Sequence, residues 1–292
     1  MNTIVLNQSN ILAGSNNSTL VYNFPTSVRF DNHQIAVQSV NMYYSWQNIN
    51  STSLKNNTFT FTWVVGSTTT THTVVIPNGL YEISDINNFL QFTFIQKGMY
   101  LINATGQYVY YAEFLVNPNT YAVNIITYPF PTSLPSGWVL PVANTQTGAV
   151  AFVGFPTQTF NPLITIPANF SLIIGYATNF TTSQNTGVNT ILTYTSSISP
   201  QVQPNPTALM TISNISNEYS SPSSVIHSVV PDVGFGELIK SVPNEYCFVK
   251  LLKGTISSLF VRFVGQDANN LNILDPNMSI ILLIRETPKS ER

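Results

Sequence analysis

The chain has 292 residues, of which 10 are Lys or Arg and 12 are Asp or Glu, so its formal net charge is −2. Charged residues make up 8% of the sequence, whereas soluble globular domains average about 25%. The basic residues are dispersed and form no patch, which argues against nucleic-acid binding through phosphate neutralisation. A surface so poor in charge repels other copies of itself weakly, and this favours self-association.

The sequence predicts neither a secretion signal nor a membrane-spanning helix. The N-terminus lacks a basic segment followed by a long apolar core, and no window reaches about 18 uninterrupted apolar residues. Cys247 is the single cysteine, so no disulfide can form within the chain. It lies in the apolar run 246–252, where we expect a buried, inert thiol.

The N-terminal part predicts an arm followed by antiparallel strands. Residues 1–18 are polar and rich in asparagine, and we expect an arm that is partly disordered unless a neighbour holds it. The clearest strand is 58–65, where aromatic residues alternate with threonines, so that one face is apolar. The glycine at 66 predicts a turn, after which 70–76 returns as the hairpin partner. Two further strands are expected at 19–24, ending at Pro25, and at 34–46.

One amphipathic helix is predicted after the hairpin. Its apolar residues fall at positions i, i+3, i+4 and i+8, which places them on one face. Ser84 should cap its N-terminus and Gly98 should end it. We expect this helix to cover a sheet rather than to carry chemistry. The residues of the apolar face are Ile86, Phe89, Leu90 and Phe94.

The centre of the chain contains no charged residue and no histidine. Between Phe114 and Asn217 there is no Asp, Glu, Lys, Arg or His. General acid–base and metal chemistry draw on these side chains, so this stretch predicts no conventional catalytic site. Six prolines at 129–162 predict irregular loops. Strands are expected at 99–102, 108–116, 121–128, 163–166, 170–176 and 191–194.

The C-terminal part predicts a second set of strands. The segment 256–264 shows the clearest alternation of apolar and polar residues. Many short strands with almost no helix predict an all-β sandwich or barrel. We find no internal repeat. The other expected strands are 207–212, 224–230, 237–242, 246–252 and 278–284.

The histidines show no metal-binding pattern. His33, His72 and His227 are far apart in the sequence and none has the spacing of a metal motif. We interpret each as a structural residue. Asp31 and His33 lie in a turn, where aspartate favours local backbone bonds, and they would need a third ligand from elsewhere to bind a metal. We therefore predict no metal site.

The remaining motifs also lack the features of a catalytic site. Asp267 and Asp275 flank the loop 266–270, which lacks the spacing of a calcium loop and predicts a hairpin turn. Gly234 and Gly236 have no third glycine and no following helix, so we expect a flexible turn. The sequence predicts no catalytic or cofactor-binding residues, no cofactor and no enzymatic activity.

Several stretches resemble the single jelly-roll minor capsid (penton) proteins of virophages, Polinton-like viruses and related large DNA viruses. They are 74–88, with I-P-x-G-x-Y before a helix, 170–176, and the pair 256–267 and 275–285. The resemblance implies an eight-stranded jelly-roll sandwich with an inserted β/loop region and one short helix, and no catalytic residues. We expect an arm at 1–18, the jelly roll at 19–127 and 201–292, and the charge-free insertion at 128–200.

The resemblance also implies a structural role in an icosahedral virion, assembled in the cytoplasm of the host cell. The chain would form pentamers at the capsid vertices and contact the major capsid protein. A neutral, amide-rich surface and an N-terminal arm suit such an assembly, because many copies of one surface must pack without like-charge repulsion.

Two other classes of function stay open. One is a carbohydrate-binding adhesin or fibre head, in which exposed aromatic rings stack on sugars. The other is a jelly-roll glycosidase, which needs two facing carboxylates, for example Glu113 and Asp267. The charge-free centre argues against the glycosidase. The candidate sugar-stacking residues are Trp46, Trp138, Tyr108, Tyr110 and Tyr111.

Overall fold

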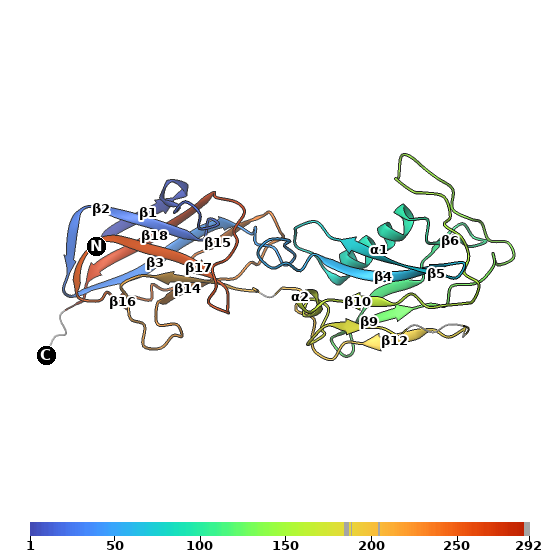
Figure 1. Cartoon of the computed structure of the whole chain (residues 1–292). Helices are drawn as coiled ribbons and strands as arrows, with labels where there is room; N and C mark the ends of the chain where they lie inside the picture. The colour runs from blue at the N-terminus through green and yellow to red at the C-terminus, as the bar shows by residue number, and fades with distance from the viewer. Residues whose placement is uncertain (184–186, 188, 204, 289–292) are drawn as a thin grey trace. The chain divides into compact units, whose positions relative to one another are not determined.

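The chain forms two compact units, one inserted into the other. The computed structural model describes residues 1–183, 187, 189–203 and 205–288 (Figure 1). The first unit combines Met1–Gln47 with Asn205–Arg292, and the second is Asn48–Pro204. The predicted insertion, 128–200, falls inside the second unit, which begins earlier in the chain. The parts of the predicted ranges at 184–186, 188, 204 and 289–292 lie outside the described residues.

The first unit is a jelly roll built from two antiparallel sheets. One sheet has the order β1-β18-β3-β15, with β16 also paired to β3, and the other has the order β14-β13-β17-β2. Numbered along the chain, the eight principal strands run 1-8-3-6 and 5-4-7-2, which is the order of a jelly roll. The predicted all-β jelly-roll fold is therefore confirmed. The strands are β1 (Asn2–Asn7), β2 (Thr19–Phe30), β3 (His33–Tyr43), β13 (Ala208–Ile212), β14 (Val225–Val229), β15 (Leu238–Ser241), β16 (Val249–Lys250), β17 (Gly254–Val264) and β18 (Met278–Glu286).

Alternating side chains give this unit its core. In β17, Leu259, Val261 and Phe263 are buried while the residues between them are exposed or half-buried. In β18, Ile280 and Leu282 are fully buried. Because successive residues of a strand point to opposite faces, each sheet presents one apolar face. The strong alternation predicted for 256–264 is confirmed.

The prediction of a partly disordered N-terminal arm is wrong for residues 2–7. These residues form β1, which pairs with β18 from Asn2, opposite Ile284, to Asn7, opposite Ser279. Ile4 and Leu6 are buried. Only two apolar residues of this short strand face the core, and the polar residues around them hide the alternation in the sequence. A short 3-10 helix, η1 (Gln8–Asn10), follows.

The prediction that the next strand ends at Pro25 is also wrong. Strand β2 continues through Pro25 to Phe30. It is the edge strand of its sheet, next to β17, and the register shifts between the pairs Asn23–Ser258 and Val28–Ile256. Proline is tolerated at such a place, because an edge strand with a bulge does not need every backbone N–H for pairing.

The second unit contains three small antiparallel sheets and the main helix (Figure 1). The sheets have the orders β11-β10-β4-β5, β12-β9-β8 and β6-β7. Val65 of β4 pairs with Thr68 of β5, which confirms the predicted hairpin and its turn. The strands are β4 (Thr58–Val65), β5 (Thr68–Val75), β6 (Leu101–Ile102), β7 (Tyr108–Val109), β8 (Ala112–Asn117), β9 (Ala122–Thr127), β10 (Ile164–Ile166), β11 (Phe180–Thr181) and β12 (Leu192–Thr195).

The segment 170–176, predicted as a strand, is not one. It contains the end of a short helix, α2 (Ala168–Ser171), followed by turns. Gly175 has a φ of +82°, which belongs to a turn rather than a strand. Periodicity alone does not distinguish a short apolar run in a strand from one in a buried helix, and here Pro167 begins the helix.

The main helix, α1 (Ile83–Gln96), begins before the predicted cap at Ser84. Its N-cap is Glu82, whose backbone N–H donates to the carboxylate of Asp85 at 2.9 Å. The helix packs against β8 and β5. In the described ranges, neither this helix nor the shorter ones is long and apolar enough to cross a membrane. The buried face comprises Ile83, Ile86, Leu90 and Phe94, with Phe89 partly buried beside it.

Gly98 ends α1, as predicted. Its φ is +63°, and its N–H donates to the carbonyl of Ile95 at 3.1 Å, while that of Met99 donates to Phe94 at 2.9 Å. This is a Schellman motif, which requires a left-handed residue after the helix. A Cβ at Gly98 would lie 2.2 Å from the carbonyl oxygen of Ala151.

Trp63 is the centre of the second unit's core. It is fully buried, and its ring centroid lies 4.7 Å from that of Phe130, 5.4 Å from Phe160, 5.7 Å from Phe94 and 6.4 Å from Tyr111. These rings come from the helix, the sheets and the proline-rich loops. One side chain therefore joins the regular and irregular parts of this unit.

In each unit, a hydrogen bond joins the two chain segments that connect it to the other unit. In the first unit, the Trp46 Nε1–H donates to the carbonyl of Asn205 at 3.1 Å. In the second, the buried Asn48 side chain donates to Val202 at 2.5 Å and to Tyr81 at 2.7 Å, and accepts from the Tyr81 N–H at 2.9 Å. The insertion therefore leaves and rejoins the first unit at neighbouring points.

Two substitutions in β1 test whether this strand is part of the core. We expect Leu6→Ala to lower the free energy of unfolding by about 2–5 kcal/mol, because it removes a fully buried side chain. Val5→Ala, at a 52% exposed position of the same strand, should cost less than about 1 kcal/mol. Urea unfolding of the full chain measures both. If both substitutions lower the free energy of unfolding by the same small amount, residues 2–7 are an arm and not part of the core.

A pair of glycine substitutions tests the end of α1. Gly98→Ala should destabilise the second unit by more than about 2 kcal/mol, since it adds a clash with a backbone carbonyl to the cost of a positive φ. Gly106→Ala is the matched control, because its φ is +81° and no atom lies within 4 Å of the added Cβ. Thermal unfolding monitored by tryptophan fluorescence compares them. If the two variants are equally stable, the contact with Ala151 contributes nothing.

Candidate functional site

An aromatic groove of about 680 Å³ lies in the second unit. The hairpin β6–β7, the strand β8, the segment after β9 and the proline-rich loop all contribute to it. We call this site the aromatic groove. Its lining includes Tyr108, Tyr110, Tyr111, Glu113, Tyr128 and Trp138.

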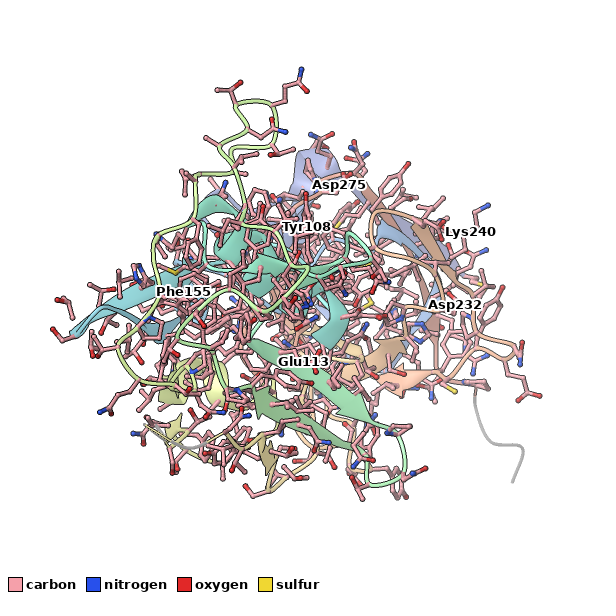
Figure 2. The ribbon with its side chains drawn as sticks, turned by 90° about the vertical axis from the view of Figure 1, so that its right-hand side faces the viewer. Tyr108, Glu113, Phe155, Asp232, Lys240 and Asp275 are labelled. Atoms are coloured by element: carbon pink, nitrogen blue, oxygen red, sulfur yellow. The ribbon has the colours of Figure 1, made fainter. Side chains whose placement is uncertain are left out.

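The hairpin β6–β7 presents Tyr108 at the groove (Figure 2). The side-chain oxygen of Asn103 closes this hairpin by accepting from the N–H groups of Thr105 at 3.0 Å and Gln107 at 2.9 Å. Tyr108 is 51% exposed, and its ring centroid lies 4.9 Å from that of Tyr100. One ring face is therefore supported while much of the side chain remains open to solvent.

Tyr110 and Tyr111 form the deeper wall. The Tyr110 ring is stacked on Phe94, with centroids 6.3 Å apart, and Tyr111 packs edge-on against Phe130 at 4.6 Å. Burial, with smaller effects of Tyr100 and Tyr108, raises the pKa of Tyr110 to about 12, and burial also raises the pKa of Tyr111. Both hydroxyls are therefore neutral at physiological pH.

Glu113 is the only formally charged residue among the described residues that line the groove. The Tyr128 hydroxyl donates a hydrogen bond to its Oε1. Burial first, and then this hydrogen bond and the charge of Glu113, raise the pKa of Tyr128 to about 12. Within the described ranges, no Lys, Arg or His forms an ion pair with Glu113. The groove thus contains a half-buried carboxylate that is oriented by a tyrosine and not neutralised by a cation.

Trp138 lines the groove from the loop that pairs with β6. It is partly buried against the core of the unit. The next residue, Val139, exchanges two backbone hydrogen bonds with Ile102 of β6, at 2.9 and 3.0 Å, and this bridge fixes the loop beside the hairpin. Prolines in the lining further limit the flexibility of the chain around the groove. They are Pro129, Pro131 and Pro135.

The structure brings together four of the five aromatic residues that the sequence analysis singled out for sugar stacking. Trp46 does not join them, because it belongs to the first unit. Trp46 and Tyr111 are each 4% exposed, so the interpretation of these two residues as exposed stacking residues is wrong. Glu113 lies in the groove, whereas Asp267 belongs to the first unit. The four residues are Tyr108, Tyr110, Tyr111 and Trp138.

The histidines have structural surroundings. The Nε2 of His72 lies 2.9 Å from the Thr70 hydroxyl, and burial and the nearby Lys97 lower its pKa. The Nε2 of His227 lies 2.8 Å from the Ser241 hydroxyl, and burial lowers its pKa. His33 packs edge-on against Phe30, with centroids 5.2 Å apart. Among the residues with described positions, no three His, Cys, Asp or Glu side chains gather in a way that could hold a metal.

The acidic loops make local contacts. Asp267 accepts from the backbone and side chain of Asn269, and Asp275 accepts from the backbone and side chain of Asn277. Asp31 pairs with Arg29 at 2.9 Å and lies 3.9 Å from Lys253. These carboxylates therefore stabilise turns.

Two further sequence interpretations concern the chain between β14 and β17. Gly236 lies in a turn with a φ of +86°, and the Gly234 N–H donates to the Glu237 carboxylate at 2.9 Å. Cys247 is exposed, so the prediction of a buried thiol is wrong. Within the apolar run 246–252, β16 is followed by the buried Leu251, whereas Cys247 lies before this strand and is exposed.

Sequence reasoning missed the pairing of Glu113 with Tyr128. Neither residue lies in a recognisable motif, and 15 positions separate them. One signal was available, since Glu113 is the last charged residue before the charge-free stretch that begins at Phe114. The neighbouring strands β8 and β9 bring the two side chains together.

The fold defines a class of protein, a jelly roll that carries a second β unit as an insertion. No protein-family model matches the chain. No curated protein matches it either. Among solved structures, the chain is similar to the crystal structure of the mavirus penton protein, with 10% sequence identity and a TM-score of 0.41, over 98% of this chain and 100% of that one.

The Tyr128–Glu113 pair makes a prediction for high pH. The raised pKa of Tyr128 means that the folded chain favours its neutral phenol. The contribution of this group to folding stability is therefore complete below about pH 10, the ordinary tyrosine pKa. It is lost as the pH rises through about 12. Glu113→Gln should lower the Tyr128 pKa but leave it above 10, because burial is the largest cause. Carbon-13 NMR titration of labelled tyrosine rings measures this, with Tyr128→Phe to assign the signal. An unchanged pKa in Glu113→Gln would contradict the described contact.

Proposed function

We propose that the chain is a structural protein of a viral capsid, and specifically the vertex (penton) protein. In this proposal it forms a pentamer, contacts the major capsid protein and resides in the virion after assembly in the host cytoplasm. The observation that carries the proposal is the jelly-roll strand order of the first unit. Jelly rolls occur in viral capsid proteins, lectins and cupins.

The charge distribution supports a role in assembly rather than in catalysis. The second unit, 48–204, contains two Lys (55 and 97) and three acidic residues (82, 85 and 113), which give 2 − 3 = −1. A closed ring buries the same two patches between every pair of neighbours. Patches without charge pack in this way without like-charge repulsion or the cost of burying ions. A neutral subunit surface therefore suits a ring.

An exposed apolar segment of the first unit supports an interface there. Large apolar side chains between residues 230 and 252 are exposed by 37–63%. The same segment contains β15, which lies at the edge of its sheet and, among the described strands, pairs with β3 alone. Exposed apolar groups beside an unpaired strand edge mark a surface that associates with another chain. We assign this segment to the contact between subunits. The exposed residues are Val230, Phe235, Leu238, Val242, Tyr246 and Leu252.

The mass of the native protein tests the proposal. We expect light scattering coupled to size exclusion to give five times the chain mass of 32.3 kDa. Electron microscopy of the same fraction should show fivefold rings. A monomer at every concentration, or a dimer or trimer, would contradict a pentamer that forms by itself.

A pair of substitutions tests the assigned contact. Val242→Asp places a charge at a 63% exposed position of the apolar segment, and we expect it to shift the pentamer towards monomer, because burying an unpaired carboxylate is costly. Val142→Asp, at a 74% exposed position of the second unit, is the matched control and should leave the mass unchanged. If Val242→Asp leaves the mass unchanged, the segment is not the contact.

A further inference from the structure

We infer that the aromatic groove of the second unit binds an uncharged oligosaccharide. The inference does not depend on the assembly of the chain, because all the residues that carry it lie in one unit. It follows from three features of the groove: its aromatic walls, its single carboxylate and its lack of cations.

The aromatic walls suit the apolar faces of sugar rings. Tyr108 is half exposed and Trp138 is partly buried, so both rings combine an anchored side with an accessible one. Tyr100 lies behind Tyr108 at 4.9 Å, and the Val139–Ile102 bridge holds the Trp138 loop. Rings that are already held in place lose little conformational entropy when a ligand binds.

The carboxylate suits sugar hydroxyls. Glu113 accepts the Tyr128 hydroxyl at Oε1, and no donor to its Oε2 is found among the described residues. Hydrogen bonds to a charged acceptor are stronger than those between neutral groups. The amides of Asn103 and Gln107, which also line the groove, add neutral polar groups beside Tyr108. Hydroxyl donors from a ligand would therefore find an oriented acceptor between aromatic walls.

The charge of the groove excludes anionic ligands. No Lys, Arg or His is found among the described residues of the lining, and Glu113 repels phosphate, sulfate and carboxylate groups. A quaternary ammonium ion is the competing occupant, since aromatic rings and a carboxylate attract it. The amides and a volume of about 680 Å³ favour a larger, hydroxyl-rich ligand, because pockets of this size enclose ligands of many atoms.

Ligand-observed NMR on the full chain tests the inference. The probes are uncharged oligosaccharides of glucose, galactose, mannose and N-acetylglucosamine, with sialyllactose and choline as anionic and cationic comparisons. We expect saturation transfer to at least one uncharged oligosaccharide and none to sialyllactose. Tryptophan fluorescence should report the same binding through Trp138, because Trp46 and Trp63 are buried.

Groove variants make the result specific. Tyr108→Ala and Glu113→Gln should each weaken binding about tenfold or more. Glu113→Gln keeps an oxygen for the Tyr128 hydroxyl, and thermal unfolding should confirm that both variants are folded. The matched controls are Tyr219→Ala, at a 98% exposed tyrosine of the first unit, and Glu218→Gln beside it, and both should bind like the wild type.

Three outcomes would overturn the inference. They are no binding of any uncharged oligosaccharide, binding of choline alone, and binding that the groove variants leave unchanged. Each is distinguishable from failure of the proposed pentamer, which the mass of the native protein tests. A pentamer that binds no sugar would contradict only the inferred sugar binding. A monomer that binds sugar would contradict only the proposed pentameric ring.

Discussion

The pairing of β18 with both β1 and β3 is the interaction on which the first unit depends. Strand β18 lies between β1 and β3, and it pairs with β3 from Met278 to Glu286 and with β1 from Asn2 to Asn7. This sheet is therefore complete only when both β1 and β18 are in place. The entropy of closing a loop grows slowly with its length, by about 0.6 kcal/mol for each doubling. The jelly roll can therefore accommodate a second unit between β3 and β13.

Much of the fold was predictable because apolar and polar residues alternate in the sequence wherever a strand has one buried face. Strand β4 and strand β17 are examples, and Gly66 and Gly98 mark the turn and the helix end near their predicted places. The errors have different physical causes. Strand β1 and residue Pro25 depend on a partner strand far away in the sequence, which no local pattern contains.

The aromatic groove shows a similar limit. The sequence identified Tyr108, Tyr110 and Tyr111 as a cluster and Trp138 as a separate candidate. Which of these rings can contact a ligand depends on their solvent exposure, and exposure depends on the tertiary fold. Trp46 illustrates this, since its indole N–H donates a hydrogen bond to a backbone carbonyl inside the first unit. The role of Glu113 depends on Tyr128, which only the pairing of β8 with β9 brings near.

The hydrogen bonds at the chain crossings have an evolutionary consequence. Trp46 donates a hydrogen bond to Asn205 in the first unit, and Asn48 donates one to Val202 in the second. Each unit therefore keeps its own two connecting segments together. A gene segment encoding 48–204 can then be replaced by another whose ends lie equally close together, without a change in the strand pairing of the jelly roll. Selection can in this way alter what the inserted unit recognises while the jelly roll keeps the same sheets.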